Sequence, residues 1–270
     1  MEVTFLEKIF LTSRIFTNTR EALDYAKNNN YYGVEWYLNK MRLMLNPQKA
    51  EEFFNELNQY PELFFSFHLP TSDVEIGHKS KFYAETSLKY LMIYIDFLRP
   101  WLTKQKYRLI FTMHIGANSM PMELLNWETS KGNLKKLGQH VSEANGCLCL
   151  ENLKMGWTAE PKKLIDLVKY AGVNITFDSG HAASSPVVLE RKLSIVEYIN
   201  QLKPYIDYVH LYSYETVEEG RHMPPKTWGE IKDIWSAIKS IKEIKGITVE
   251  LTTLPELEYT YHLLKRYSNI

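Results

Sequence analysis

The sequence has few cysteines, no long apolar run and no excess of charge of either sign. Its two cysteines, Cys147 and Cys149, lie two residues apart in an apparent strand, so both side chains point the same way, into a packed interior rather than into a disulfide. The segment from Met1 to Asn18 lacks the uninterrupted apolar stretch of a secretory signal. We therefore expect a cytoplasmic protein, and no segment is apolar enough to suggest a membrane span.

Positive and negative side chains balance, with 32 lysines and arginines against 32 aspartates and glutamates. Without an overall positive field the chain is not drawn to nucleic acid or to anionic lipid, and we expect neither as a partner. No glycine-rich phosphate loop is readable, so recognition of a phosphorylated substrate stays open. The sequence also leaves assembly into a homo-oligomer open.

What is present is a regular alternation of short β-type runs and longer helical segments, the pattern of a parallel sheet built from βα units. The predicted strands are Ile9 to Ser13, Gly33 to Tyr37, Leu63 to His68, Arg108 to His114, Gly146 to Asn152, Ile175 to Asp178, Ile206 to Leu211 and Gly246 to Leu251. The predicted helices include Thr19 to Asn28, Pro47 to Gln59, Tyr83 to Leu98, Pro161 to Tyr170, Trp228 to Ile241 and Glu256 to Arg266. Eight strands without a linker predict an α/β fold, a single (β/α)₈ TIM barrel over residues 1–270; a doubly wound open sheet is the rival architecture.

Most of the predicted strands finish in an ionisable residue. These residues are Glu35, His68, His114, Glu151, Asp178, His210 and Glu250. Residues two positions earlier share their face of the strand, and all but Tyr208 are small, whereas the positions between are large and apolar, as expected of residues that face the helices. The ionisable side chains therefore point inward at the carboxyl ends of the strands, which form the active-site face of such a barrel.

Carboxylates gathered at one mouth repel one another by several kcal/mol, and a bound cation relieves this. Glu35, Glu151, Asp178 and Glu250 would converge there, with His210 as a neutral nitrogen donor. Such a mixed oxygen and nitrogen set suits a divalent metal ion, namely manganese, magnesium, cobalt, iron or zinc.

Several fragments together resemble one family. They are Gly-Val-Glu-Trp at 33–36, His-Ile-Gly at 114–116, Leu-Glu-Asn at 150–152, Phe-Asp-Ser-Gly-His at 177–181, Val-His-Leu at 209–211 and Val-Glu at 249–250. As a set they resemble the xylose isomerase-like TIM barrels, which include sugar phosphate isomerases and epimerases, inosose dehydratase and endonuclease IV, and which are also known as AP endonuclease family 2. The resemblance spans nearly the whole chain.

In the ketose epimerase branch, the positions matching Glu151, Asp178, His210 and Glu250 bind one metal ion. The resemblance implies that Glu151 and Glu250 also exchange the substrate proton as acid and base, through an enediolate. It implies that His181 and Arg221 hydrogen-bond substrate oxygens, and Glu35 is expected to orient a histidine or to bind a substrate hydroxyl. Where many members have His-x-His and then an acidic residue, this chain reads His-Leu-Tyr-Ser at 210–213, so the substrate contacts there must differ.

The endonuclease IV branch implies additional zinc ions. Further residues that match its ligand set, and are candidates for additional metal, are His68, His114, His181 and His222. Its Asp-x-His element appears here as Gly220-Arg221-His222, which lacks the carboxylate and argues against a full three-metal cluster. We interpret His222 as a solvated loop residue. His68 and His114 are also candidates for substrate contact, and Trp36 and Tyr212 for apolar stacking in the cavity.

These observations favour a divalent-metal-dependent sugar or sugar-phosphate isomerase or epimerase. Two alternatives stay open, an endonuclease IV-like zinc phosphodiesterase acting on DNA and a non-catalytic ligand-binding barrel. A dehydratase, which is a lyase, would use the same metal and base and is not excluded. The sequence does not name the sugar.

Overall fold

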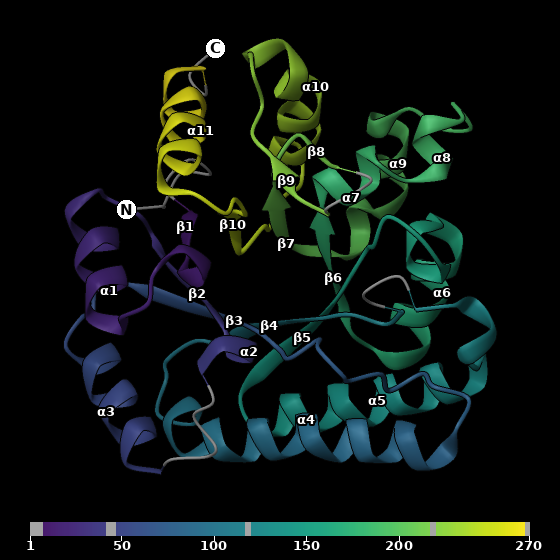
Figure 1. The fold of residues 1–270 in the computed structure, drawn as a ribbon, viewed down its shortest axis with the longest axis horizontal. Helices are drawn as coiled ribbons and strands as arrows, with labels where there is room; N and C mark the ends of the chain where they lie inside the picture. Colours follow the sequence, from purple (N-terminus) through teal and green to yellow (C-terminus); the bar gives the residue numbers. More distant parts are fainter. Residues whose placement is uncertain (1–7, 42–46, 117–119, 217–219, 268–270) are drawn as a thin grey trace.

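A closed barrel of eight parallel strands forms the centre of the molecule, with helices around its outside (Figure 1). The computed structural model describes residues 8–41, 47–116, 120–216 and 220–267. The barrel strands, in their spatial order, are β1 (Ile9–Thr12), β10 (Gly246–Val249), β7 (Ile206–Leu211), β6 (Asn174–Asp178), β5 (Gly146–Glu151), β4 (Leu109–Met113), β3 (Phe64–His68) and β2 (Gly33–Tyr37). Each corresponds to a predicted strand, so the (β/α)₈ barrel is confirmed.

Helices follow most of the barrel strands. They are α1 (Thr19–Asn28), α2 (Leu38–Met41), α3 (Pro47–Asn58), α4 (Lys81–Leu102), α5 (Trp127–Glu143), α6 (Pro161–Ala171), α7 (Ser179–Ala183), α8 (Pro186–Leu189), α9 (Ile195–Leu202), α10 (Trp228–Lys239) and α11 (Leu254–Tyr267), with 3₁₀ turns η2 (Ser13–Ile15), η4 (Met122–Leu124), η5 (Trp157–Ala159) and η6 (Lys203–Tyr205). Among the described residues, no helix is both long enough and apolar enough to cross a membrane.

The predicted helices do not include α5 and α9, nor the short helices α2, α7 and α8, and α4 is longer than predicted. In α5 the buried face includes Ser130 and Asn133 beside its apolar residues, which weakens the apolar period. Helix α9 begins with a capping box in which the side chains of Ser194 and Glu197 bond each other's backbone N–H. Helix α4 runs on to Leu102 although Pro100 cannot donate a backbone hydrogen bond.

The barrel interior is apolar near the amino ends of the strands and becomes polar toward their carboxyl ends. Phe10, Ile110, Cys147, Cys149 and Tyr208 form an interior cluster. The Tyr208 hydroxyl contacts Ser66 Oγ at 2.7 Å and Thr248 Oγ1 at 2.8 Å, so the polar tip of this buried ring is satisfied. These hydroxyls lie next to the layer of ionisable side chains, on the side toward the amino ends of the strands.

The segment from Ser213 to Lys226 contains a short antiparallel pair, β8 (Tyr214–Glu215) and β9 (His222–Met223). Glu215 lies opposite His222 in this pair. The pairing brings both residues over the carboxyl ends of the barrel strands, beside the layer of ionisable side chains.

Candidate metal centre

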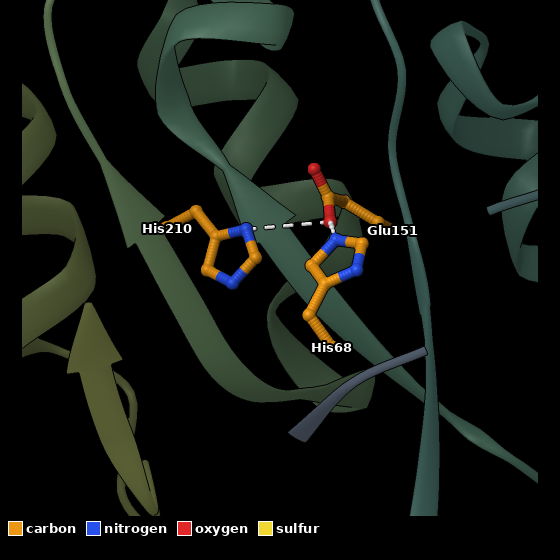
Figure 2. Close-up of side chains that lie close together, drawn as sticks. All are labelled: His68, Glu151 and His210. Atoms are coloured by element: carbon orange, nitrogen blue, oxygen red, sulfur yellow. Dashed lines mark ion pairs between the residues drawn. The ribbon is translucent and has the colours of Figure 1, made fainter. Parts of the chain in front are cut away.

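Glu151, the last residue of β5, lies at the centre of the ionisable side chains at the barrel mouth, which is the end where the carboxyl ends of the strands meet. Its Oε2 atom lies 3.0 Å from His114 Nε2, 3.4 Å from His68 Nε2 and 3.3 Å from His210 Nδ1. Figure 2 shows His68 and His210 approaching this carboxylate from different sides. Glu151 is 1% exposed, so three imidazoles replace water around its negative charge.

The four residues predicted to share one ion lie together. Glu151, Asp178, His210 and Glu250 each offer one ligand atom, and these atoms all lie within 4.8 Å of one another. His210 Nδ1 lies 2.9 Å from Glu250 Oε2 and 3.9 Å from Asp178 Oδ2. Neighbouring strands β5, β6, β7 and the end of β10 supply the four in sequence around the barrel.

The donor atoms fit a cation. Among the described residues, Asp178 Oδ2, His210 Nδ1 and Glu250 Oε2 are buried and make no hydrogen bond of normal geometry, although the last two lie 2.9 Å apart. Leaving buried polar atoms unpaired costs free energy, on the order of 1–3 kcal/mol each and more when charged. The other atoms of these side chains are in use, since Asp178 Oδ1 accepts the His181 backbone N–H at 2.7 Å and so caps α7. The unpaired atoms are therefore the ones left for an ion.

Three histidines are held in the orientation typical of metal ligands. The Nδ1 atoms of His68, His181 and His222 contact the backbone carbonyls of Leu69, Asn152 and Glu250 at 2.9, 3.0 and 2.8 Å. A carbonyl only accepts, so each Nδ1 carries a proton and Nε2 is the ring atom left to bind an ion. Ligating histidines usually donate their other N–H in this way, which fixes the ring and its tautomer.

His210 is anchored in the opposite sense. Its Nε2 lies 3.0 Å from Glu35 Oε1, and both side chains are fully buried. The Nδ1 atom is thereby turned toward the carboxylates of the mouth. Glu35 therefore orients this histidine, one of the two roles expected for it.

Burial and mutual charge set the protonation of the site. Burial raises the pKa of Glu151 and Glu250, but neighbouring histidines outweigh it and hold both pKa values well below the usual range. Burial raises the pKa of Asp178 well above its usual value, and the two glutamates add to this effect. Without metal, the mouth thus balances ionised glutamates against imidazolium.

A cavity of about 890 Å³ opens above these residues. Among the described residues, its lining includes Arg14, His68, His114, Glu151, Lys154, His181, Glu215, His222 and Glu250. The volume lies within the range of small-molecule sites, and its walls carry both charged and apolar groups.

Comparison with known proteins fits this geometry. The sequence matches the family described as xylose isomerase-like TIM barrel over residues 23–261. The chain belongs to that family. A relative from Methanocaldococcus jannaschii, the uncharacterised protein MJ0008, is 30% identical over 159 residues, which is 56% of this chain and 67% of that protein.

Solved structures of the xylose isomerase-like fold superpose over nearly the whole chain. A D-tagatose 3-epimerase-like protein has a TM-score of 0.72 at 17% identity and covers 97% of both chains. The IolI protein, solved with a bound zinc atom, has a TM-score of 0.71 at 14% identity and covers 97% of this chain and 96% of its own.

The prediction that His222 is a solvated loop residue was wrong. It is 8% exposed, lines the cavity, and stacks on the Tyr212 ring with centroids 4.0 Å apart. Tyr212 itself is fully buried behind His222 and is not part of the described cavity lining, so the predicted stacking on substrate is wrong. Its ring instead holds His222 in place.

Two other predicted substrate contacts lie elsewhere. The Arg221 side chain is 42% exposed and pairs with Glu256 of α11. Trp36 faces the helices, where its ring meets Phe53 of α3 edge-on with centroids 5.1 Å apart. Trp36 follows the inward-facing Glu35 on the same strand, and adjacent strand residues point to opposite faces.

Three residues of the mouth were not predicted from the sequence. Glu215 Oε2 lies 3.2 Å from His181 Nε2, and its Oε1 accepts from Lys154 at 2.7 Å. Arg14 on η2 pairs with Glu250 Oε1 at 2.5 Å. Glu215 thus places a carboxylate beside His222, from the opposing strand of the β8–β9 pair.

The tight packing behind His222 predicts the effect of Gly180→Ala. A Cβ at Gly180 would lie 1.9 Å from Tyr212 Cε2, so the ring would have to move and His222 with it. We expect the free energy of unfolding to fall by about 1–3 kcal/mol. Denaturant unfolding measures this, with Gly132→Ala in α5 as the control, because no atom of the described residues would lie within 4 Å of its Cβ. Equal stability of the two variants would contradict the packing argument.

Metal binding is expected to tighten as pH rises. Burial lowers the pKa of His181 and His210, but neighbouring carboxylates outweigh it and raise both pKa values well above 6.5. Both imidazoles are therefore protonated at neutral pH, and a ring nitrogen must lose its proton before it binds the ion. The affinity for the metal should then rise about tenfold per pH unit for each proton released. Titration calorimetry in buffers of different ionisation enthalpy counts these protons. Affinity that stays constant between about pH 6 and about pH 8 would contradict the prediction.

Proposed function

We propose that this chain is a divalent-metal-dependent sugar or sugar-phosphate isomerase or epimerase that moves a proton through an enediolate. The observation that carries the proposal is the convergence of two buried carboxylates, Glu151 and Glu250, which lie 3.3 and 2.9 Å from His210 Nδ1. The similarity to an epimerase-like protein and to the zinc-binding IolI protein supports it.

The residues suggest how the reaction would be divided. A divalent ion held by Glu151, Asp178, His210 and Glu250 would polarise a carbonyl and the neighbouring hydroxyl, which acidifies the carbon between them. One glutamate removes the proton from that carbon and the other returns a proton on the opposite face. Both glutamates are ionised at rest, as their low pKa values require.

Cationic side chains at the mouth bind two of its carboxylates, Glu250 and Glu215. Arg14 pairs with Glu250 and steadies its position, whereas Lys154 and His181 are both bound to Glu215 on the other side of the cavity. Arg14 lies with its guanidinium 5.1 Å from the Tyr37 ring centroid. These groups surround the space where substrate oxygens would lie and supply hydrogen-bond donors to them.

Deuterium exchange tests this function directly. The metal-loaded protein is incubated in D₂O with ketoses, aldoses and their phosphates, and the sugars are read by mass spectrometry and NMR. We expect deuterium at the carbon beside the carbonyl, together with the second isomer or epimer. A product lighter by one water would identify a dehydratase instead. No exchange with any of these sugars would contradict the proposal.

A second candidate, zinc-dependent phosphodiester hydrolysis, is favoured by one observation. His68 Nε2 and His114 Nε2 lie 3.2 Å apart and both face the same Glu151 oxygen, an arrangement suited to a second ion bridged by that carboxylate. His181, Glu215 and His222 supply the donor types for a third. The zero net charge gives no support for DNA as substrate.

Metal stoichiometry and substrate separate the candidates. One ion per chain with hydrogen exchange on a sugar supports the isomerase. Two or three zinc ions with cleavage of abasic DNA or of a chromogenic phosphodiester support the hydrolase. In the hydrolase, a His68→Asn, His114→Asn variant should lose a bound zinc ion together with cleavage, whereas in the isomerase it should still bind one ion per chain. Sugar or metal binding without any turnover would identify a ligand-binding barrel.

A further inference from the structure

A second cluster of metal-binding side chains lies at the opposite end of the barrel. Cys147, near the start of β5, precedes the mouth residue Glu151 by four positions, about 13 Å along a strand. Cys147 Sγ, Cys149 Sγ and a carboxylate oxygen of Asp207 lie within 4.8 Å of one another. The proposed isomerase chemistry uses none of them.

We propose that Cys147, Cys149 and Asp207 form a site for a thiophilic divalent ion such as zinc or cadmium, here called the basal site. Tetrahedral zinc has bonds of about 2.3 Å to sulfur and about 2.1 Å to oxygen, which places sulfur and oxygen about 3.6 Å apart. Cys147 Sγ already lies 3.4 Å from Asp207 Oδ2. Little movement of the strands is therefore needed for both atoms to bind one ion.

The donor types distinguish the basal site from the mouth. The mouth offers oxygen and nitrogen, whereas the basal site offers two sulfur atoms and one oxygen, and thiolates select soft ions. Both cysteines are free and buried, with Cys147 7% and Cys149 0% exposed. Asp207 is 17% exposed and leaves an entry path from the base of the barrel.

The surroundings of the basal site already compensate negative charge. Lys245 Nζ lies 2.5 Å from Asp207 Oδ2 and 3.7 Å from Cys147 Sγ. Two thiolates and one carboxylate carry three negative charges, two of which a divalent ion would balance in place of this ammonium. Lys245 is 44% exposed on a flexible stem, so its head can swing toward water and make room for an ion.

The two thiols differ in how readily they release a proton. A hydrogen bond with Cys149 lowers the pKa of Cys147 to about 7, whereas burial and Cys147 raise the pKa of Cys149 well above its usual value. Ion binding would then displace two thiol protons with no change of oxidation state, and the two sulfur–metal bonds would replace two S–H bonds. The bound ion would join β5 to β7 at the base of the barrel.

Cadmium titration of the 270-residue chain tests the basal site, because cadmium–thiolate bonds give an ultraviolet charge-transfer band and the chain has no other cysteines. We expect the band to saturate at one cadmium per chain. It should be lost in Cys147→Ser and in Cys149→Ser, and Asp207→Asn should weaken cadmium binding at least tenfold. Glu151→Gln, at the mouth, should keep the band unchanged, so that failure of the basal site and failure of the proposed function are told apart.

Two results would overturn the basal site. One is the absence of a thiolate band at cadmium concentrations that fill the mouth. The other is unchanged cadmium affinity in Asp207→Asn, which would mean that the thiols bind cadmium without a built site. Lys245→Met keeps all three proposed ligands and changes an exposed side chain, so it tests the basal site in a variant that is expected to fold. Removing the competing ammonium should tighten cadmium binding, and weaker binding would count against the proposal.

Discussion

Glutamine in place of Glu151 is expected to lower turnover by roughly 10³-fold or more and to weaken metal binding at the mouth. The change keeps the size of the side chain but removes the negative charge that faces His68, His114 and His210. It also removes a base, since an amide does not take up a proton at neutral pH. Turnover on the sugar identified by deuterium exchange, together with metal affinity, measures both losses.

A matched control for Glu151→Gln is Glu128→Gln, because the Glu128 side chain is 76% exposed on α5. It should leave turnover and metal affinity unchanged. Circular dichroism should show that both variants keep the fold. Activity of Glu151→Gln within a few-fold of the parent protein would mean that Glu151 neither binds the ion nor moves the proton.

The second large effect is expected for Glu250→Gln, which should abolish net isomerisation while the fold stays intact. If the two glutamates act on opposite faces of the substrate carbon, losing one should leave part of the proton exchange in place. We therefore expect one epimer still to exchange its proton with D₂O through Glu151, slowly and without forming the other epimer. NMR of each pure epimer in D₂O follows this separately from net conversion.

A contrasting variant at the same ion pair is Arg14→Lys, which keeps a cation near Glu250 but loses the planar guanidinium that contacts it at 2.5 Å. It should change turnover far less than Glu250→Gln does. If Glu250→Gln abolished exchange from both epimers while metal affinity was retained, the assignment of one glutamate to each face would be wrong.

The barrel and the layer of ionisable side chains at its mouth could be predicted because both depend on local sequence. Strand alternation places Glu35, Glu151 and Asp178 inward, and parallel strands in a barrel bring their carboxyl ends together. The same alternation places Trp36 on the outer face of the strand, which contradicts the predicted stacking of Trp36 in the cavity.

The remainder of the site depends on contacts between segments far apart in the sequence. Glu215 reaches His181 only because β8 pairs with β9, and no local pattern specifies that register. Arg14 lies on a short 3₁₀ turn and meets Glu250 at the other end of the chain. His222 is buried because Tyr212 stacks on it, a tertiary contact that a loop sequence does not reveal.

Anomalous X-ray diffraction from crystals soaked in zinc tests the central claim most directly. The account predicts a peak at the mouth, about 2.0–2.2 Å from His210 Nδ1 and from carboxylate oxygens of Glu151, Asp178 and Glu250. Crystals that show no anomalous peak within bonding distance of these four side chains, with zinc bound elsewhere or not at all, would contradict it.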